Sequence, residues 1–169
     1  IYRDVRFSKD KSPYKTHAAC WFFHRDGRHN VGREAVGGGA GFYFHFSPRG
    51  SFLGGGLWMP PRPALNTLRE AIAEDLKGFE RVVANPAVKR RFGGLSDEAM
   101  LKRTPRGFAP DHPAARWLKY QSFVLGREIS DDHVTSVRLP GRLERDYTAI
   151  LPLVRWLNRA LGLMPATRR

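Results

Sequence analysis

Residues 42–59 read FYFHFSPRGSFLGGGLWM, and this stretch decides the fold. Over residues 42–47 phenylalanines alternate with tyrosine, histidine and serine, which is the period of a β-strand. Residues 48–50 (PRG) are typical of a turn, and an apolar run returns over 51–59, so the sequence predicts an antiparallel hairpin. The three glycines at 54–56 weaken a strand unless a bulge, or a ligand close to the backbone, requires them.

Helical spacing follows the hairpin. Apolar residues recur at steps of three and four from Leu65 to Val83, which predicts one helix of about twenty residues. Asn85 is expected to cap a short helix that Pro86 opens and Gly93 ends. The polar face of this short helix carries three cations: Lys89, Arg90 and Arg91.

The other predicted elements are a buried strand over 16–24, a short strand over 99–104, a short helix starting at 111–113, a strand over 120–127, a helical turn or two capped by Ser130, and a closing helix over 147–161. Pro152 must kink the closing helix or lie in its first turn. Strands first, followed by mixed helices and strands, predict a single α+β domain over residues 1–169, with a mainly antiparallel sheet packed with helices.

The charge balance is strongly basic. Lys and Arg number 29 against 16 Asp and Glu, which gives a net charge of +13. Such an excess attracts nucleic acid or another polyanion, although a well-solvated basic surface accounts for it equally. Apolar runs fall short of the roughly 20 residues that span a bilayer, so no membrane partner is expected. The single cysteine permits no internal disulfide, which favours a cytoplasmic location.

Motifs for metal, cofactor or nucleophile chemistry are missing. The six histidines are not paired at ligand spacing, and neither nucleotide-binding glycine motif occurs, so we expect no metal and no cofactor. A nucleophilic-serine motif is also lacking, and Cys20 lies in a predicted buried strand, where a thiolate is disfavoured. His45 should point away from the phenylalanines that flank it.

Residues 3–15 (RDVRFSKDKSPYK) carry five cations against two acids. One interpretation is a structural ion-pair network around Asp4 and Asp10. The other is a loop that binds an anion, because the planar guanidinium group fits phosphate and carboxylate. The sequence leaves both interpretations open.

Three blocks carry a family resemblance: RDVRFSKDKSPYKTHAA at 3–19, GGGLWMPPRPALNTLREAI at 54–72 and LKRTPRGFAPDHP at 101–113. In this order they resemble the conserved hypothetical proteins of the domain-of-unknown-function 2461 family. Members of that family usually begin with a further helical segment, so we expect this sequence to lack an upstream piece. The resemblance implies no reaction. It implies a signature of polar and glycine positions: Arg3, Asp4, Arg6, Lys11, Tyr14, Lys15, Gly55, Gly56, Arg69, Lys102, Arg106, Asp111 and His112.

Three functions stay open. The first is the binding of an anionic partner, either nucleic acid or a phosphorylated ligand, in a basic cleft. The predicted anion ligands are Arg3, Arg6, Lys11, Tyr14, Lys15, Gly55, Gly56, Arg69, Lys102 and Arg106. The second is a hydrolase or transferase that acts in the same cleft, with Asp4, Asp111 or His112 as proton carrier. The third is an accessory protein that docks on a larger complex through its charged surface. The oligomeric state is left open.

Overall fold

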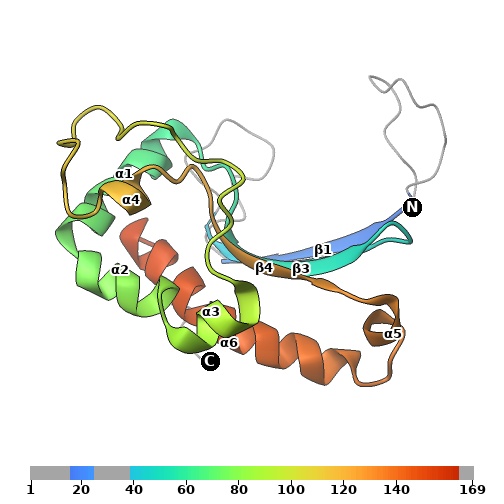
Figure 1. Ribbon diagram of the computed structural model, residues 1–169. Coiled ribbons are helices and arrows are strands. Elements are labelled where there is room, and N and C mark those ends of the chain that lie inside the picture. Colours follow the sequence, from blue (N-terminus) through green and yellow to red (C-terminus); the bar gives the residue numbers. More distant parts are fainter. Residues whose placement is uncertain (1–15, 25–38, 164–169) are drawn as a thin grey trace, which may run out of the picture.

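The computed structural model describes residues 16–24 and 39–163 (Figure 1). Its strands form one antiparallel sheet in the order β1 (Ala18–Phe23), β2 (Gly41–Phe46), β3 (Ser51–Leu57) and β4 (Phe123–Ile129). The helices of the described part are α1 (Arg62–Glu74), α2 (Leu76–Val83), α3 (Pro86–Phe92), α4 (Ala115–Leu118), α5 (Asp131–Val134) and α6 (Leu139–Ala160). The predicted α+β class with an antiparallel sheet is therefore confirmed.

The predicted hairpin is β2–β3, and its register is regular. Phe44 pairs with Leu53 and Tyr43 with Gly54, and the β3–β4 pairing runs equally without an inserted residue. The register therefore continues through the glycines, and the alternative of a bulge is wrong. Gly56 has φ of 131°, and a β-carbon at this position would collide with the Phe123 carbonyl oxygen. Only glycine fits there without strain.

The two faces of the sheet differ. Cross-strand partners share a face, so alternation separates a helix face from an open face. On the helix face, Phe42 contacts Tyr147 of α6 at 5.0 Å between ring centroids, and a β-carbon at Gly55 would lie 2.7 Å from Ile150 Cγ2. In the view of Figure 1, α6 passes beneath the sheet. The fully buried side chains between sheet and helices include Leu53, Leu68, Ile72, Phe79, Phe123, Leu125, Ile150, Leu153 and Leu157.

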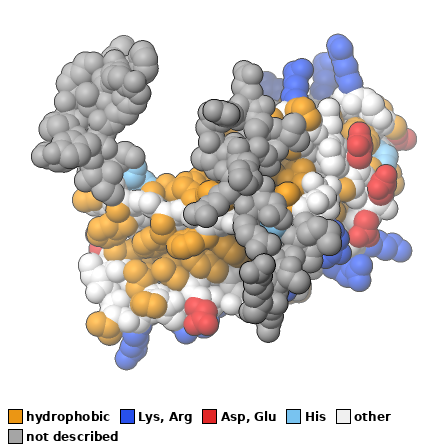
Figure 2. All heavy atoms as spheres, turned by 180° about the vertical axis from the view of Figure 1, so that it is seen from behind, with side chains coloured by type: hydrophobic (Ala, Val, Ile, Leu, Met, Phe, Trp, Pro, Cys, Tyr) orange, Lys and Arg blue, Asp and Glu red, His pale blue; other side chains and the backbone are white. Residues whose placement is uncertain are grey.

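The open face carries the other side chains of the strands. His45 points there, as predicted, and its ring stacks on those of His17 and Phe52, at 4.8 Å in each case. Burial, and then the neighbouring His17, lower the pKa of His45. Figure 2 shows hydrophobic side chains gathered over the sheet. Of the exposed ones, Trp21 and Phe52 stand on the open face, and Trp58 and Met59 directly follow β3. Phe22 and Phe46 are also exposed but share the face of Phe42.

Helix α1 ends where the sequence predicted that one long helix would continue. Asp75 adopts φ of −124° and ψ of 60°, and its Oδ1 accepts a hydrogen bond from the Gly78 amide at 2.9 Å. This carboxylate caps a new helix, α2, because it satisfies an N–H group that the first turn leaves unpaired. The prediction of a single helix of about twenty residues is wrong. The prediction for α3 is confirmed, because Asn85 accepts from the Ala87 amide and Gly93 ends the helix at φ of 77°.

The remaining elements differ from the prediction in detail. Residues 99–104 form no strand and make only one bridge, between Met100 and Tyr120. The predicted short helix starts later, at Ala115, and Ser130 precedes α5 without a capping side-chain bond. Strand β1 is an edge strand and not buried, so Cys20 is exposed.

Helix α6 begins eight residues earlier than predicted, at Leu139, and it contains Pro152 in its interior. Near its C-terminus, Asn158 Oδ1 accepts from the Ala40 amide at 2.7 Å, and Asn158 Nδ2 donates to the Ala40 carbonyl at 3.1 Å. This amide pair joins the last helix to the start of β2. No helix within the described ranges is both long enough and apolar enough to cross a membrane.

Candidate anion-binding site

Asp146 is the most buried ionisable side chain of a polar network between α6 and the sheet. Only 2% of the side chain is exposed. It lies one residue before Tyr147, in the part of α6 that faces the end of β4. A carboxylate at this depth requires charged partners, because burying an unpaired charge costs several kcal/mol (about 3–5 when one partner of a buried pair is removed).

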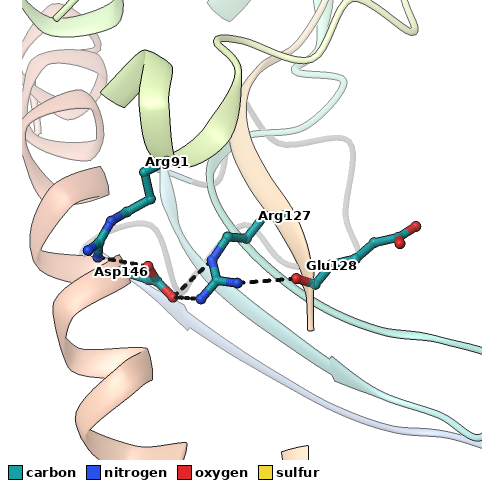
Figure 3. A network of polar contacts seen from close by, with 4 residues as sticks. All are labelled: Arg91, Arg127, Glu128 and Asp146. Atoms are coloured by element: carbon teal, nitrogen blue, oxygen red, sulfur yellow. Dashed lines mark hydrogen bonds and ion pairs between the residues drawn. The ribbon is translucent and has the colours of Figure 1, made fainter. Parts of the chain in front are cut away.

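Two arginines supply those partners (Figure 3). Arg127, on the helix face of β4, donates from Nη2 to Asp146 Oδ2 at 2.6 Å and from Nε at 3.2 Å. Arg91, in the last turn of α3, donates from Nη1 to Oδ1 at 2.9 Å. Both carboxylate oxygens are therefore occupied, and the three elements are joined at one point.

Two more arginines stand on α6 beside this network. Arg142 lies one turn before Asp146, and Arg145 lies three residues after Arg142, so the i, i+3, i+4 spacing brings the three residues to the same side of the helix. Together with Arg91, Arg127 and Asp146 they line a hollow of about 300 Å³, called here the arginine hollow. Four guanidinium groups against one carboxylate leave a formal charge of +3, four minus one.

The positive charge of the arginine hollow is only partly compensated within the described residues. Asp146 is the single carboxylate of the lining, and its oxygens accept from Arg91 and Arg127. Arg142 Nε is buried and has no hydrogen-bond partner in the described part of the chain. A buried donor without an acceptor is costly, so an anion that enters the hollow gains a ready partner.

The predicted ligands of the N-terminal segment cannot be placed. Arg3, Arg6, Lys11, Tyr14, Lys15 and the proposed proton carrier Asp4 lie outside the described residues. Their role stays a prediction.

Three predicted ligands have structural positions in the described chain. Gly55 and Gly56 belong to the central strand β3, where close packing requires them. Arg69 on α1 is 7% exposed, and its Nε donates to the Leu118 carbonyl at 2.9 Å. A second, longer bond of 3.4 Å reaches the Tyr120 carbonyl. Burial lowers the pKa of Arg69. These bonds tie α1 to the segment that leads into β4.

The residues of the third block lie on the loop between α3 and α4. Lys102, Arg106 and Asp111 are exposed, and none of them lines the arginine hollow. His112 is half-buried, and its Nδ1 accepts from the Ala114 amide at 3.0 Å, so it holds the turn before α4. The described residues thus do not assemble the cleft that the sequence suggested.

Sequence reasoning noted Arg91 as part of a basic helix face but missed the other members of the hollow. Arg142, Arg145 and Asp146 follow the i, i+3, i+4 spacing of one helix face, which is a usable signal once a helix is assumed there. Within the described residues, no group of three or more His, Cys, Asp or Glu side chains is arranged to hold a metal ion.

Comparison with known proteins gives one match. A family model described as "Conserved hypothetical protein (DUF2461)" matches residues 1–156, which confirms the resemblance seen in the three sequence blocks. No curated protein matches the chain, and no solved structure does.

Proposed function

We propose that this chain, which belongs to the DUF2461 family of conserved hypothetical proteins, binds the phosphate group of an anionic ligand in the arginine hollow. One observation carries the proposal. Arg142 and Arg145 line a hollow whose only described carboxylate already accepts from Arg91 and Arg127.

The chemistry of the lining supports phosphate. Guanidinium groups donate in pairs to phosphate oxygens, and charge-assisted bonds of this kind are about twice as strong as neutral ones. The Asp146 network orients Arg91 and Arg127 before a ligand arrives, so little side-chain freedom is lost on binding. The carboxylate of Asp146 therefore acts as a positioning group.

The size of the hollow limits the ligand. About 300 Å³ lies at the lower end of the range of small-molecule sites, roughly 300–1,000 Å³. A free phosphorylated molecule fits such a volume, and so does one phosphate of a nucleic-acid backbone that passes over the surface. The two sources share the same chemistry, and the experiment below separates them.

The proposal keeps the anionic ligand of the sequence analysis and moves its site. The hydrolase or transferase alternative gains no support, because Asp111 and His112 do not line the arginine hollow. An accessory protein that docks through its charged surface needs no hollow. For such a protein, the hollow variant Arg142→Gln/Arg145→Gln and the surface variant Arg155→Gln should have equal effects.

The experiment titrates the protein with inorganic pyrophosphate and, separately, with a short single-stranded oligonucleotide at several salt concentrations. The variant Arg142→Gln/Arg145→Gln should weaken binding about tenfold or more. With the single-stranded oligonucleotide, it should also reduce the slope of log K against log salt by about 0.7 units, because the hollow holds one backbone phosphate. Arg155→Gln is the matched control, because Arg155 is exposed on α6 and lies outside the hollow.

The outcomes separate the ligands. Binding of pyrophosphate that depends on Arg142 and Arg145 indicates a small phosphorylated ligand, whereas binding of the oligonucleotide alone indicates nucleic acid. If the double variant binds both probes as tightly as the unmodified protein, or if neither probe binds, the arginine hollow is not a phosphate site.

A further inference from the structure

A second and larger hollow lies on the open face of the sheet, on the side opposite to the arginine hollow. Its volume is about 790 Å³, which is within the range of small-molecule sites. We call it the open-face groove. Its floor is formed by glycines on neighbouring strands: Gly41, Gly54, Gly56 and Gly126.

The glycine floor brings a ligand close to the backbone. Gly54 pairs with Tyr43 on one side and with Gly126 on the other, so these two neighbouring positions of β3 and β4 contribute no side chain to the open face. Gly126 is partly exposed, whereas Gly41, Gly54 and Gly56 are buried, so a ligand in the groove reaches the backbone at Gly126. Close approach of a ligand to the backbone is one reason for glycines inside a strand.

Aromatic rings form one side of the open-face groove. Trp21 and Tyr43 lie 4.5 Å apart between ring centroids, and Tyr43 and Phe52 lie 5.5 Å apart. Trp58, directly after β3, also lines the groove. Trp21 is 55% exposed and Trp58 is 50% exposed. Clustered aromatic rings in contact with solvent mark a binding surface more often than scattered ones do.

Carboxylates form the other side. The segment 92–98 after α3 is held to the sheet by a hydrogen bond of 2.9 Å from the Ser96 amide to the Val124 carbonyl, and it brings Asp97 and Glu98 to the groove. Glu128 of β4 adds a third carboxylate. Arg127 is the only cation among the described lining residues, and its guanidinium is bonded to Asp146.

Among the described residues, the groove therefore combines aromatic faces with more carboxylates than cations, in a chain whose net charge is +13. We propose that the open-face groove binds a small organic cation, an ammonium or methylated ammonium group on an apolar body. Aromatic faces attract such cations through their quadrupoles, and nearby carboxylates add Coulomb attraction. A phosphate ligand would be repelled by the same carboxylates. A neutral apolar ligand would gain nothing from them.

The test uses choline and its neutral isostere 3,3-dimethylbutan-1-ol, titrated by calorimetry and by tryptophan fluorescence. The two probes have nearly the same shape, so their difference isolates the charge. Choline should bind about tenfold or more tightly than the isostere, which corresponds to about 1.4 kcal/mol. Equal binding of the two probes, or no binding of choline, overturns the proposal.

Variants locate the binding. Asp97→Asn/Glu98→Gln should remove most of the preference for choline, whereas Asp131→Asn/Asp132→Asn on the exposed start of α5 should leave it unchanged. Trp58→Leu keeps an apolar side chain and removes the ring, and because Trp58 is half-exposed this change spares the core. Choline binding that survives both the carboxylate variant and Trp58→Leu contradicts the site.

The same measurements can also show that something other than a cation occupies the open-face groove. If a neutral disaccharide such as cellobiose binds at the groove and choline does not, the site is for carbohydrate and the proposal is wrong. If sedimentation shows a dimer that Trp58→Leu dissociates and choline does not, the open face is an interface between copies, and the proposal is again wrong.

Discussion

The arginine hollow and the open-face groove lie on opposite faces of one sheet, and adjacent residues of β4 serve them. Arg127 points to the helix face and bonds to Asp146, whereas the carboxylate of Glu128 extends away from that network (Figure 3). Strand alternation thus supplies opposite charges to two sites from neighbouring positions. The net charge of +13 therefore does not describe the charge at each site. The described lining of the open-face groove carries more carboxylates than cations, although the chain as a whole is basic.

The largest effect that we predict is on the stability of the sheet that forms the open-face groove. Gly56→Ala places a β-carbon against the Phe123 carbonyl at φ of 131°, so β3 and β4 must move apart. We expect a loss of about 3 kcal/mol or more in the free energy of unfolding, measured by urea denaturation. Gly50→Ala is the control, because Gly50 also has a positive φ but has open space around it. Equal losses in both variants would show that the backbone angle matters and the close packing does not.

The next largest effect is on the stability of the Asp146 network beside the arginine hollow. Asp146→Ala leaves Arg91 and Arg127 without their shared acceptor, and we expect a loss of about 2–3 kcal/mol by the same measurement. This is less than for a fully buried pair, because the two arginine side chains are 39% and 31% exposed. Glu144→Ala, at an exposed position of α6, should change stability by less than about 0.5 kcal/mol. A loss for Asp146→Ala as small as that of Glu144→Ala would mean that the network does not hold the hollow together.

A smaller loss of stability is expected when the hydrogen bond between α6 and β2 is removed. The Tyr147 hydroxyl on α6 donates to the Tyr43 carbonyl at 3.1 Å, and the Tyr43 ring stands on the open face. Tyr147→Phe removes this bond and should cost about 1 kcal/mol near neutral pH.

The pH dependence of the Tyr147→Phe effect gives a second measurement. Burial, and then the negative charges of Cys20 and Asp146, raise the pKa of Tyr147 to about 12. Because the pKa is higher in the folded state than the ordinary tyrosine value of 10.0, the stability contributed by the neutral phenol is present below pH 10 and is lost as pH rises to 12. The stability gap between the unmodified protein and Tyr147→Phe should therefore narrow between pH 10 and 12. A constant gap over this range would contradict the burial of the hydroxyl.

The smallest effect on stability is expected at Glu128, whose substitution compares the two faces of β4. Glu128→Gln should leave stability within about 0.5 kcal/mol, because its side chain is exposed, and it should weaken choline binding while pyrophosphate binding stays unchanged. Arg127→Gln should weaken pyrophosphate binding, because it removes one of the guanidinium groups of the arginine hollow. If Glu128→Gln changes the binding of pyrophosphate, the two faces are not separate.

The parts of the fold that were predictable depend on neighbours in the sequence. The β2–β3 hairpin follows from alternation around a turn, and α3 follows from Asn85, Pro86 and Gly93, whose effects act within one helical turn. The break at Asp75 was missed because the apolar period continues through it. Local side-chain capping decides that break, and hydrophobic spacing does not record it.

The arginine hollow was not predictable in the same way. Its members come from α3, β4 and α6, and they meet only when α6 lies across the sheet. The first turns of α6, from Leu139 to Asp146, contain Pro140, Gly141 and several charges, so the apolar period that would indicate a helix is weak there. The N-terminal segment that attracted attention in the sequence lies outside the described residues.

The amide pair between Asn158 and Ala40 has a consequence for synthesis of the chain. Its two partners are separated by 118 residues, so the whole segment between them must be synthesised before this link can close. Until then β2 lacks both its anchor and the helix that covers it, and the aromatic hairpin emerges early with no layer to shield it. The nascent chain is therefore at greatest risk of misassociation during translation, and Asn158→Ala should lower the yield of correctly folded product more than it speeds unfolding of the finished protein.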